Sequence, residues 1–249
     1  VKDSNASSGK AIVTVSSTNS LNNTNWVFDT AGAVYWTNSS GDNKWSTAAN
    51  WSTGVVPIST DAVYFSSVST ANCTVDQNVT VAKIATLSGY GGTIDFGANT
   101  ISVAGDCDLR YATVTLGTSV INITANNATF SYPTDLTLNS NNGLNMTGAS
   151  GQTVVIPGSF TITTGSNFTP GTSTVKFTAA SGPKILDMIY NPASPTLNKF
   201  YNLVFDGVGG SWQYKPTGSQ QALQVDNDLS VVNGIFDNAT TGTNKNITI

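Results

Sequence analysis

The sequence has no histidine and no glutamate, and Arg110 is its only arginine. Without an imidazole, the chain has no base for a Ser-His-Asp or Cys-His nucleophile. Its two cysteines are too few for a zinc site, which takes several Cys or His ligands. Basic residues are scarce and unclustered, which argues against nucleic-acid binding. No apolar run approaches the roughly 20 residues of a membrane span. We therefore expect no cofactor, no nucleic acid and no membrane span.

Charge is also scarce, because only 10% of the 249 residues are charged and the formal net charge is −4. All acidic residues are aspartates, and serine, threonine and asparagine supply most of the polarity. Without glutamate, and with few lysines or leucines, no segment can form an ordinary charged amphipathic helix. The composition therefore favours strands and turns.

Apolar residues alternate with polar ones in short segments throughout the chain, as in Val175/Phe177 and Leu203/Phe205. Turn signals such as Gly91-Gly92 and Asn233-Gly234 separate these segments. An echo between Gly158–Gly165 and Asn227–Gly234, at an offset of 69, suggests three coils of about 23 residues. The pattern predicts an all-β fold, a parallel β-helix-like β-solenoid, with a β-sandwich as the alternative.

Three regions are expected along the chain. We interpret residues 1–34 as an extended N-terminal arm, residues 35–66 as a Trp-rich cap or first coil, and residues 67–249 as the solenoid body. The cap contains Trp36, Trp45 and Trp51, and it would cover a core that is otherwise exposed at the end of a solenoid.

Two segments carry a resemblance to known families. The first, YWTNSSGDNKWSTAANWSTGVVPISTDAVYF, resembles the opening of bacterial autotransporter-like and other repeat-bearing surface proteins. Its matching positions are Trp36, Asn50, Trp51, Ser52, Gly54, Pro57, Asp61, Val63 and Phe65. The second, FTPGTSTVKF with FYNLVFDG and DLSVVNGIFD, resembles the repeats of large prokaryotic adhesins and surface-layer-like proteins. Its positions include Phe168, Pro170, Gly171, Val175, Phe177, Phe200, Tyr201, Asn202, Leu203, Leu229, Gly234 and Phe236. The resemblance implies a parallel β-helix with a surface role and no catalytic residues.

N-glycosylation signals are frequent, which is consistent with an extracellular or cell-surface protein. The chain begins at Val1, so we expect that a leader was either removed or left out of this sequence. The predicted glycan sites are Asn5, Asn22, Asn38, Asn50, Asn72, Asn78, Asn122, Asn127, Asn145, Asn167, Asn238 and Asn246.

Few side chains suggest chemistry. Cys73 and Cys107 would form one disulfide in an oxidising compartment; the alternative is two buried thiols. Trp212, in an expected loop with Tyr214 on the same face, is the candidate contact for a glycan. Two aspartate pairs, Asp106/Asp108 and Asp226/Asp228, would each point to one side of a strand. A solvated edge is the first interpretation of these pairs, followed by a calcium site and then by glycosidase carboxylates.

These observations favour a non-catalytic structural protein, a subunit of a surface filament or surface layer that self-assembles by strand addition. The expected assembly strand is Ala11-Ile12-Val13-Thr14-Val15, in an arm that could hardly fold alone. The alternatives are an adhesin-type glycan-binding module and a carbohydrate-active enzyme that uses the aspartate pairs.

Overall fold

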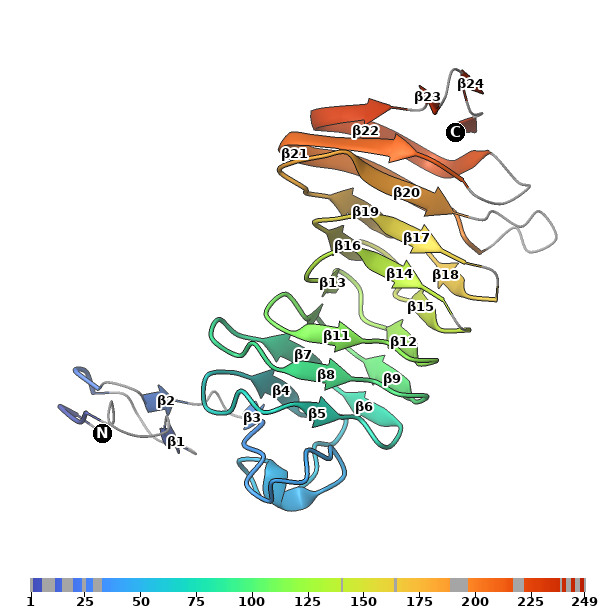
Figure 1. The fold of residues 1–249 in the computed structure, drawn as a ribbon. Coiled ribbons are helices and arrows are strands. Elements are labelled where there is room, and N and C mark those ends of the chain that lie inside the picture. Colours follow the sequence, from blue (N-terminus) through green and yellow to red (C-terminus); the bar gives the residue numbers. More distant parts are fainter. Residues whose placement is uncertain are drawn as a thin grey trace.

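The computed structural model describes residues 2–5, 12–14, 20–23, 26–28, 33–139, 141–163, 165–188, 197–216, 222–237, 239–240, 243–244 and 247–248. The chain forms a β-solenoid of about 7 turns, with almost no helix and with parallel sheets stacked along its length (Figure 1). The predicted fold class is therefore confirmed, and the sandwich alternative is wrong. Among the described residues, no helix is long and apolar enough to cross a membrane.

The largest sheet follows one face of the solenoid from end to end, and every pairing in it is parallel. Its strands on that face are β3 (Ala33–Tyr35), β4 (Ala62–Phe65), β7 (Lys83–Thr86), β10 (Cys107–Asp108), β13 (Thr129–Ser131), β16 (Thr153–Ile156), β19 (Thr174–Phe177), β21 (Phe200–Tyr214) and β22 (Leu223–Asp237).

A second face carries two separate stacks. The lower stack is β5 (Cys73–Thr74), β8 (Thr93–Asp95) and β11 (Thr113–Thr115); the upper is β14 (Leu136–Leu138), β17 (Phe160–Ile162) and β20 (Lys184–Met188). The long strand β21 pairs with β19 through its first part and with β20 through its last part. It therefore joins two faces of the solenoid into one sheet.

The third face is a continuous parallel sheet of β6 (Val79–Val81), β9 (Thr100–Val103), β12 (Val120–Ile123), β15 (Gly143–Met146) and β18 (Asn167–Thr169). The remaining elements are β1 (Ile12–Thr14), β2 (Trp26–Phe28), the 3₁₀ turn η1 (Ala48–Asn50), β23 (Ala239–Thr240), β24 (Thr243–Asn244) and β25 (Ile247–Thr248).

The core forms because alternate residues of each short strand point inward, as the period-2 pattern predicts. On the first face the inward residues stack in a register column, and nearly all of them are buried. The column runs through Val63, Ile84, Cys107, Phe130, Val154, Val175 and Leu203. Each coil alone would leave its apolar face exposed, so stacking with neighbouring coils is what stabilises it.

Aromatic side chains close the N-terminal end of the core. Trp36, Trp45 and Trp51 are at most 2% exposed, and they pack on one another and on Phe65. The indole N–H of Trp51 donates to the carbonyl oxygen of Trp45 at 2.8 Å. This cluster, which we call the Trp cap, buries the apolar surface that the first coil would otherwise expose.

Asparagine and aspartate side chains link successive coils. In each case a side-chain oxygen accepts a backbone N–H from the coil above, 21 to 24 positions later. The pairs are Asn72 with Thr93, Asn78 with Thr100, Asp106 with Thr129, Asn126 with Ala149, and Asp135 with Ser159. These bonds use backbone donors at coil corners, where the strand ladders do not reach them.

One polar side chain also links successive coils, but from inside the core. Gln152 is 1% exposed, and its amide nitrogen donates to the carbonyls of Ile123 at 2.8 Å and Ala125 at 3.0 Å. Its amide oxygen accepts the backbone N–H of Gly148 at 3.0 Å. Because all of these groups are satisfied, the buried amide joins two coils without leaving an unpaired polar atom.

The predicted disulfide is wrong, because Cys73 and Cys107 are both free and buried. Cys73 stacks beside Ile94 on the second face, whereas Cys107 lies between Ile84 and Phe130 on the first. The coil length explains this. Register partners of these cysteines lie 21 or 23 positions away, so a separation of 34 is about one and a half coils and places the thiols on different faces.

Candidate functional site

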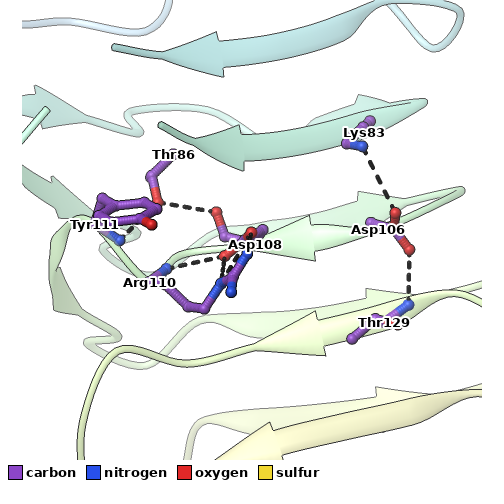
Figure 2. A network of polar contacts seen from close by, with 7 residues as sticks. All are labelled: Lys83, Thr86, Asp106, Asp108, Arg110, Tyr111 and Thr129. Carbon is purple, nitrogen blue, oxygen red and sulfur yellow. Dashed lines mark hydrogen bonds and ion pairs between the residues drawn. The ribbon is translucent and has the colours of Figure 1, made fainter. Parts of the chain in front are cut away.

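A polar hollow that combines both charge signs lies on the outer side of the first face. It has a volume of about 280 Å³, and we call it the ion-pair groove. Its lining includes Lys83, Asp106, Asp108 and Arg110, which Figure 2 shows, and also Tyr64. All of them come from or flank strands β4, β7 and β10, whose inward residues alternate with them.

Asp108 and Arg110 form the most closely bonded pair in the groove. The Arg110 guanidinium donates to both carboxylate oxygens, from Nε at 2.9 and 3.1 Å and from Nη2 at 2.7 Å. The hydrogen bonds and charge of Asp108 raise the pKa of Arg110. The guanidinium carbon also lies 5.9 Å from the ring centre of Tyr111. The arginine is thus held over a tyrosine by a carboxylate two positions away.

Asp106 has a different pair of partners. One carboxylate oxygen accepts the backbone N–H of Thr129 at 2.9 Å, and the other lies 3.6 Å from the ammonium of Lys83. The bond to Thr129 is one of the coil-linking bonds that Asn72, Asn78 and Asp135 also make. We therefore assign Asp106 to joining coils.

The two carboxylates share the outer side of β10, as expected from their spacing, but each has its own cation (Figure 2). A glycosidase needs one protonated and one ionised carboxyl beside the scissile bond, and a like-charged carboxylate pair is one arrangement that retains a proton. Here the neighbours of both groups are positive. The arrangement supports an ion-pair network and gives no support to acid–base chemistry.

The second aspartate pair lies in β22. Asp226 pairs with Lys199 and accepts the Gln224 amide at 3.1 Å, whereas Asp228 accepts the hydroxyl of Ser230 at 2.8 Å. Within the described part of the chain, no group of three or more His, Cys, Asp or Glu residues could hold a metal ion. None of Asp106, Asp108, Asp226 and Asp228, the residues of the calcium hypothesis, therefore belongs to such a group.

The proposed glycan contact at Trp212 and Tyr214 is wrong. Both side chains are 0% exposed and lie in strand β21, not in a loop. The Trp212 ring packs 5.1 Å from Phe205 and 6.3 Å from Phe177. Burial in this aromatic stack leaves neither residue a surface on which a sugar could stack.

The structure separates the predicted glycan sites by exposure. Asn5, Asn22, Asn72, Asn78, Asn127 and Asn167 are exposed or nearly so, and Asn38, Asn122 and Asn145 are half-buried. Asn50 is 0% exposed, and its amide bonds Ser40, Asp42 and the carbonyl of Lys44. Asn50 is therefore not accessible for glycosylation in the folded chain. Asn238 and Asn246 lie outside the described residues.

The expected assembly strand is only partly described. Ile12–Thr14 forms β1, which pairs in parallel with β2 of the same chain; Ala11 and Val15 lie outside the described residues. The pairing with β2 uses one edge of β1. A two-stranded sheet is marginally stable by itself, so this unit is a candidate for rearrangement onto a larger sheet.

Sequence reasoning missed Lys83 and Tyr64 as members of the groove. Lys83 precedes Asp106 by 23 positions, which is one coil, and Tyr64 lies two coils before Asp108 in the column that passes through Ala85. The coil length is the signal that could have found them.

Comparisons with known proteins found no relative: no family model, curated protein or solved structure matches the chain.

Proposed function

We propose that this chain is a non-catalytic structural subunit of an extracellular filament or surface layer, and that its copies join by strand addition. Low charge, exposed glycosylation signals and the resemblance to prokaryotic surface proteins are consistent with a surface location. A parallel β-solenoid is a rigid rod with strand edges at its ends, which suits the role of a building block.

The observation that carries the proposal is the outer edge of β22 in the last coils. One side of β22 pairs with β21, and on the other side Leu223 and Gln224 pair with β25. From Val225 to Phe236, no second strand is recorded beside β22 within the described residues. Among the described residues this stretch has backbone groups without a strand partner, and a strand of another copy could pair with them.

Apolar side chains lie on the same strand. Val231, Val232 and Ile235 are 49%, 61% and 64% exposed, and Val208 of the adjacent β21 is 78% exposed. Covering such a side chain contributes up to about 1–2 kcal/mol, and each net backbone hydrogen bond adds about 1 kcal/mol. The Trp cap protects the other end of the core, so the two ends of the solenoid differ as a polar assembly requires.

The test is a change of the β22 edge with a matched control. Val232→Lys together with Ile235→Lys should strongly reduce assembly, because the substitutions add charge to the proposed contact. Val55→Lys with Ile58→Lys is the control, since these residues are 61% and 59% exposed but follow closely after Trp51 in the sequence, far from β22 along the chain. Particles seen by electron microscopy should shorten or disappear only in the β22 variant. Equal behaviour of the two variants would remove the β22 edge from the proposal.

No structural observation favours the two alternative functions, a glycan-binding module and a carbohydrate-active enzyme. Trp212 and Tyr214 are buried, so the glycan-binding hypothesis has lost its contact residues. The aspartate pairs are neutralised by neighbouring cations or bonded to hydroxyl and amide groups. Neither alternative is therefore proposed as the function.

A further inference from the structure

The second face of the solenoid is interrupted in its middle. Strands β5, β8 and β11 form one stack and β14, β17 and β20 form the next, but β11 and β14 do not pair. The other two faces continue across the same step through the pairs β10–β13 and β12–β15. Figure 1 shows the interruption between the labels β11 and β14.

The backbone of each strand leaves an edge facing the interruption. Thr113 donates its N–H to Gly92 at 2.9 Å, and Thr115 accepts the N–H of Phe96 at 2.9 Å, so both residues face β8. Val114, between them, faces the other way because the direction alternates along a strand.

The same holds for β14. Leu136 donates its N–H to Ser159 at 2.8 Å, and Leu138 accepts the N–H of Thr163 at 2.9 Å. Both residues therefore face β17, and Thr137 between them faces β11. Each wall of the interruption thus has a backbone donor and acceptor for which no strand partner is recorded among the described residues.

A cavity of about 580 Å³ lies between these edges, and we call it the slot. Its lining includes Val114, Thr115, Leu116, Tyr132, Asp135 and Thr137. Val114 is only half-buried, whereas Ile94, in the same inward column one coil earlier, is fully buried. The core is therefore less well covered at the slot than in the adjacent coil.

The pattern of side chains on both walls defines what fits. Each wall has the order apolar, threonine, apolar: Val114-Thr115-Leu116 below and Leu136-Thr137-Leu138 above. The apolar positions point toward the core and the threonine points outward. An inserted extended segment with the same pattern would lie about 4.8 Å from each neighbour and pair with both.

We propose that the slot accepts one strand from a second copy of this chain, the segment Val13-Thr14-Val15 of its arm. This sequence repeats the apolar–threonine–apolar pattern of both walls. The proposal rests on the proposed function and names the acceptor of the arm, which leaves the β22 edge for a separate contact.

Insertion requires an exchange of partners. In the structure, β1 uses one edge to pair with β2 over three register positions. In the slot both edges of the segment would be paired, and its inward side would cover the half-buried Val114. The exchange therefore replaces a marginal two-stranded sheet with a place inside a larger ladder.

The test is disulfide trapping between full-length chains that carry single introduced cysteines. Chains with Thr14→Cys are mixed with chains with Thr137→Cys, Thr115→Cys or Thr161→Cys. Thr161 is the matched control, because it occupies the same outward column one strand above Thr137, inside a paired ladder. The native Cys73 and Cys107 are buried in the folded chain.

We expect the thiol introduced by Thr14→Cys to cross-link to both walls of the slot at about ten or more times the rate to position 161, because effective concentration depends on proximity. Equal rates at all three positions, or trapping on one wall alone, would overturn insertion. Trapping within a single chain in a Thr14→Cys/Thr137→Cys double variant, with none between chains, would overturn the second copy as the donor.

A second measurement uses the unaltered protein. The amides of Val114 and Thr137 should exchange hydrogen rapidly in isolated chains and become protected in assembled particles. Assembled particles in which both amides stay unprotected would refute the slot but leave the proposed function standing. Chains that remain monomeric at all concentrations would refute the proposed function itself.

Discussion

The buried amide of Gln152 gives a sharp test of how the coils hold together. Replacing it by methionine keeps the volume but removes three hydrogen bonds, to Gly148, Ile123 and Ala125. Each bond contributes about 1 kcal/mol net, and the stranded N–H of Gly148 adds about 1–3 kcal/mol. We expect Gln152→Met to lower the free energy of unfolding by about 4–6 kcal/mol.

The assay is urea unfolding followed by far-ultraviolet circular dichroism, with linear extrapolation to water. The control is Gln224→Met, since Gln224 is half-buried and makes one bond to Asp226 at 3.1 Å. It should change the free energy of unfolding by about 0.5 kcal/mol or less. A loss below about 1 kcal/mol for Gln152→Met would show that the amide does not join the coils.

Gln152→Glu adds a pH signature to the same site. A buried carboxyl has a raised pKa, so its protonated form can donate to Ile123 in place of the amide. The variant should approach the wild type below the unfolded pKa of about 4.3 and lose stability as the pH rises from there to the folded pKa. A stability difference that does not depend on pH would contradict this placement of the side chain.

Three further outcomes follow from the structure. Burial raises the pKa of Cys73 and Cys107, so the thiols of the native protein should resist iodoacetamide. The denatured protein should take up two labels without reductant, and uptake of none would show that the two cysteines form a disulfide. Hydrogen bonds from Thr47, Lys44 and Asn50 lower the pKa of Asp42, so stability is complete above the ordinary aspartate pKa and is lost as the pH falls below it. Tryptophan fluorescence should report this acid transition, and the transition should be absent in the Asp42→Asn variant. Arg110→Ala should lower the free energy of unfolding by at most about 1 kcal/mol in urea, because the arginine side chain is 57% exposed; a larger loss would make the groove essential to the fold.

The period-2 pattern was enough to predict the fold class and the inward residues, for example Val175, Phe177, Leu203 and Phe205. The internal echo was not a true repeat. Phe160 stacks beside Leu186 on the second face, whereas Leu229 stacks beside Leu203 on the first. Coil steps range from 20 residues, between Thr100 and Val120, to 29, between Ala33 and Ala62, so no fixed offset aligns equivalent positions.

The errors at single residues have a common cause. Gly209-Gly210 is typical of a turn, but in the solenoid it lies within the long strand β21 where the chain passes from one face to the next, and this buries Trp212. Asn50 carries a glycosylation signal, but its side chain closes the loop beneath the Trp cap. Both environments depend on contacts that exist only in the folded chain: Trp212 packs on Phe177, and Asn50 bonds Ser40, Asp42 and Lys44 across its own loop.

We propose that copies of this chain associate through strand edges into large particles. Sedimentation velocity across a wide concentration range is the decisive measurement. We expect species much larger than the 25.8 kDa chain that grow with concentration. A single species of monomer size at every concentration would contradict it.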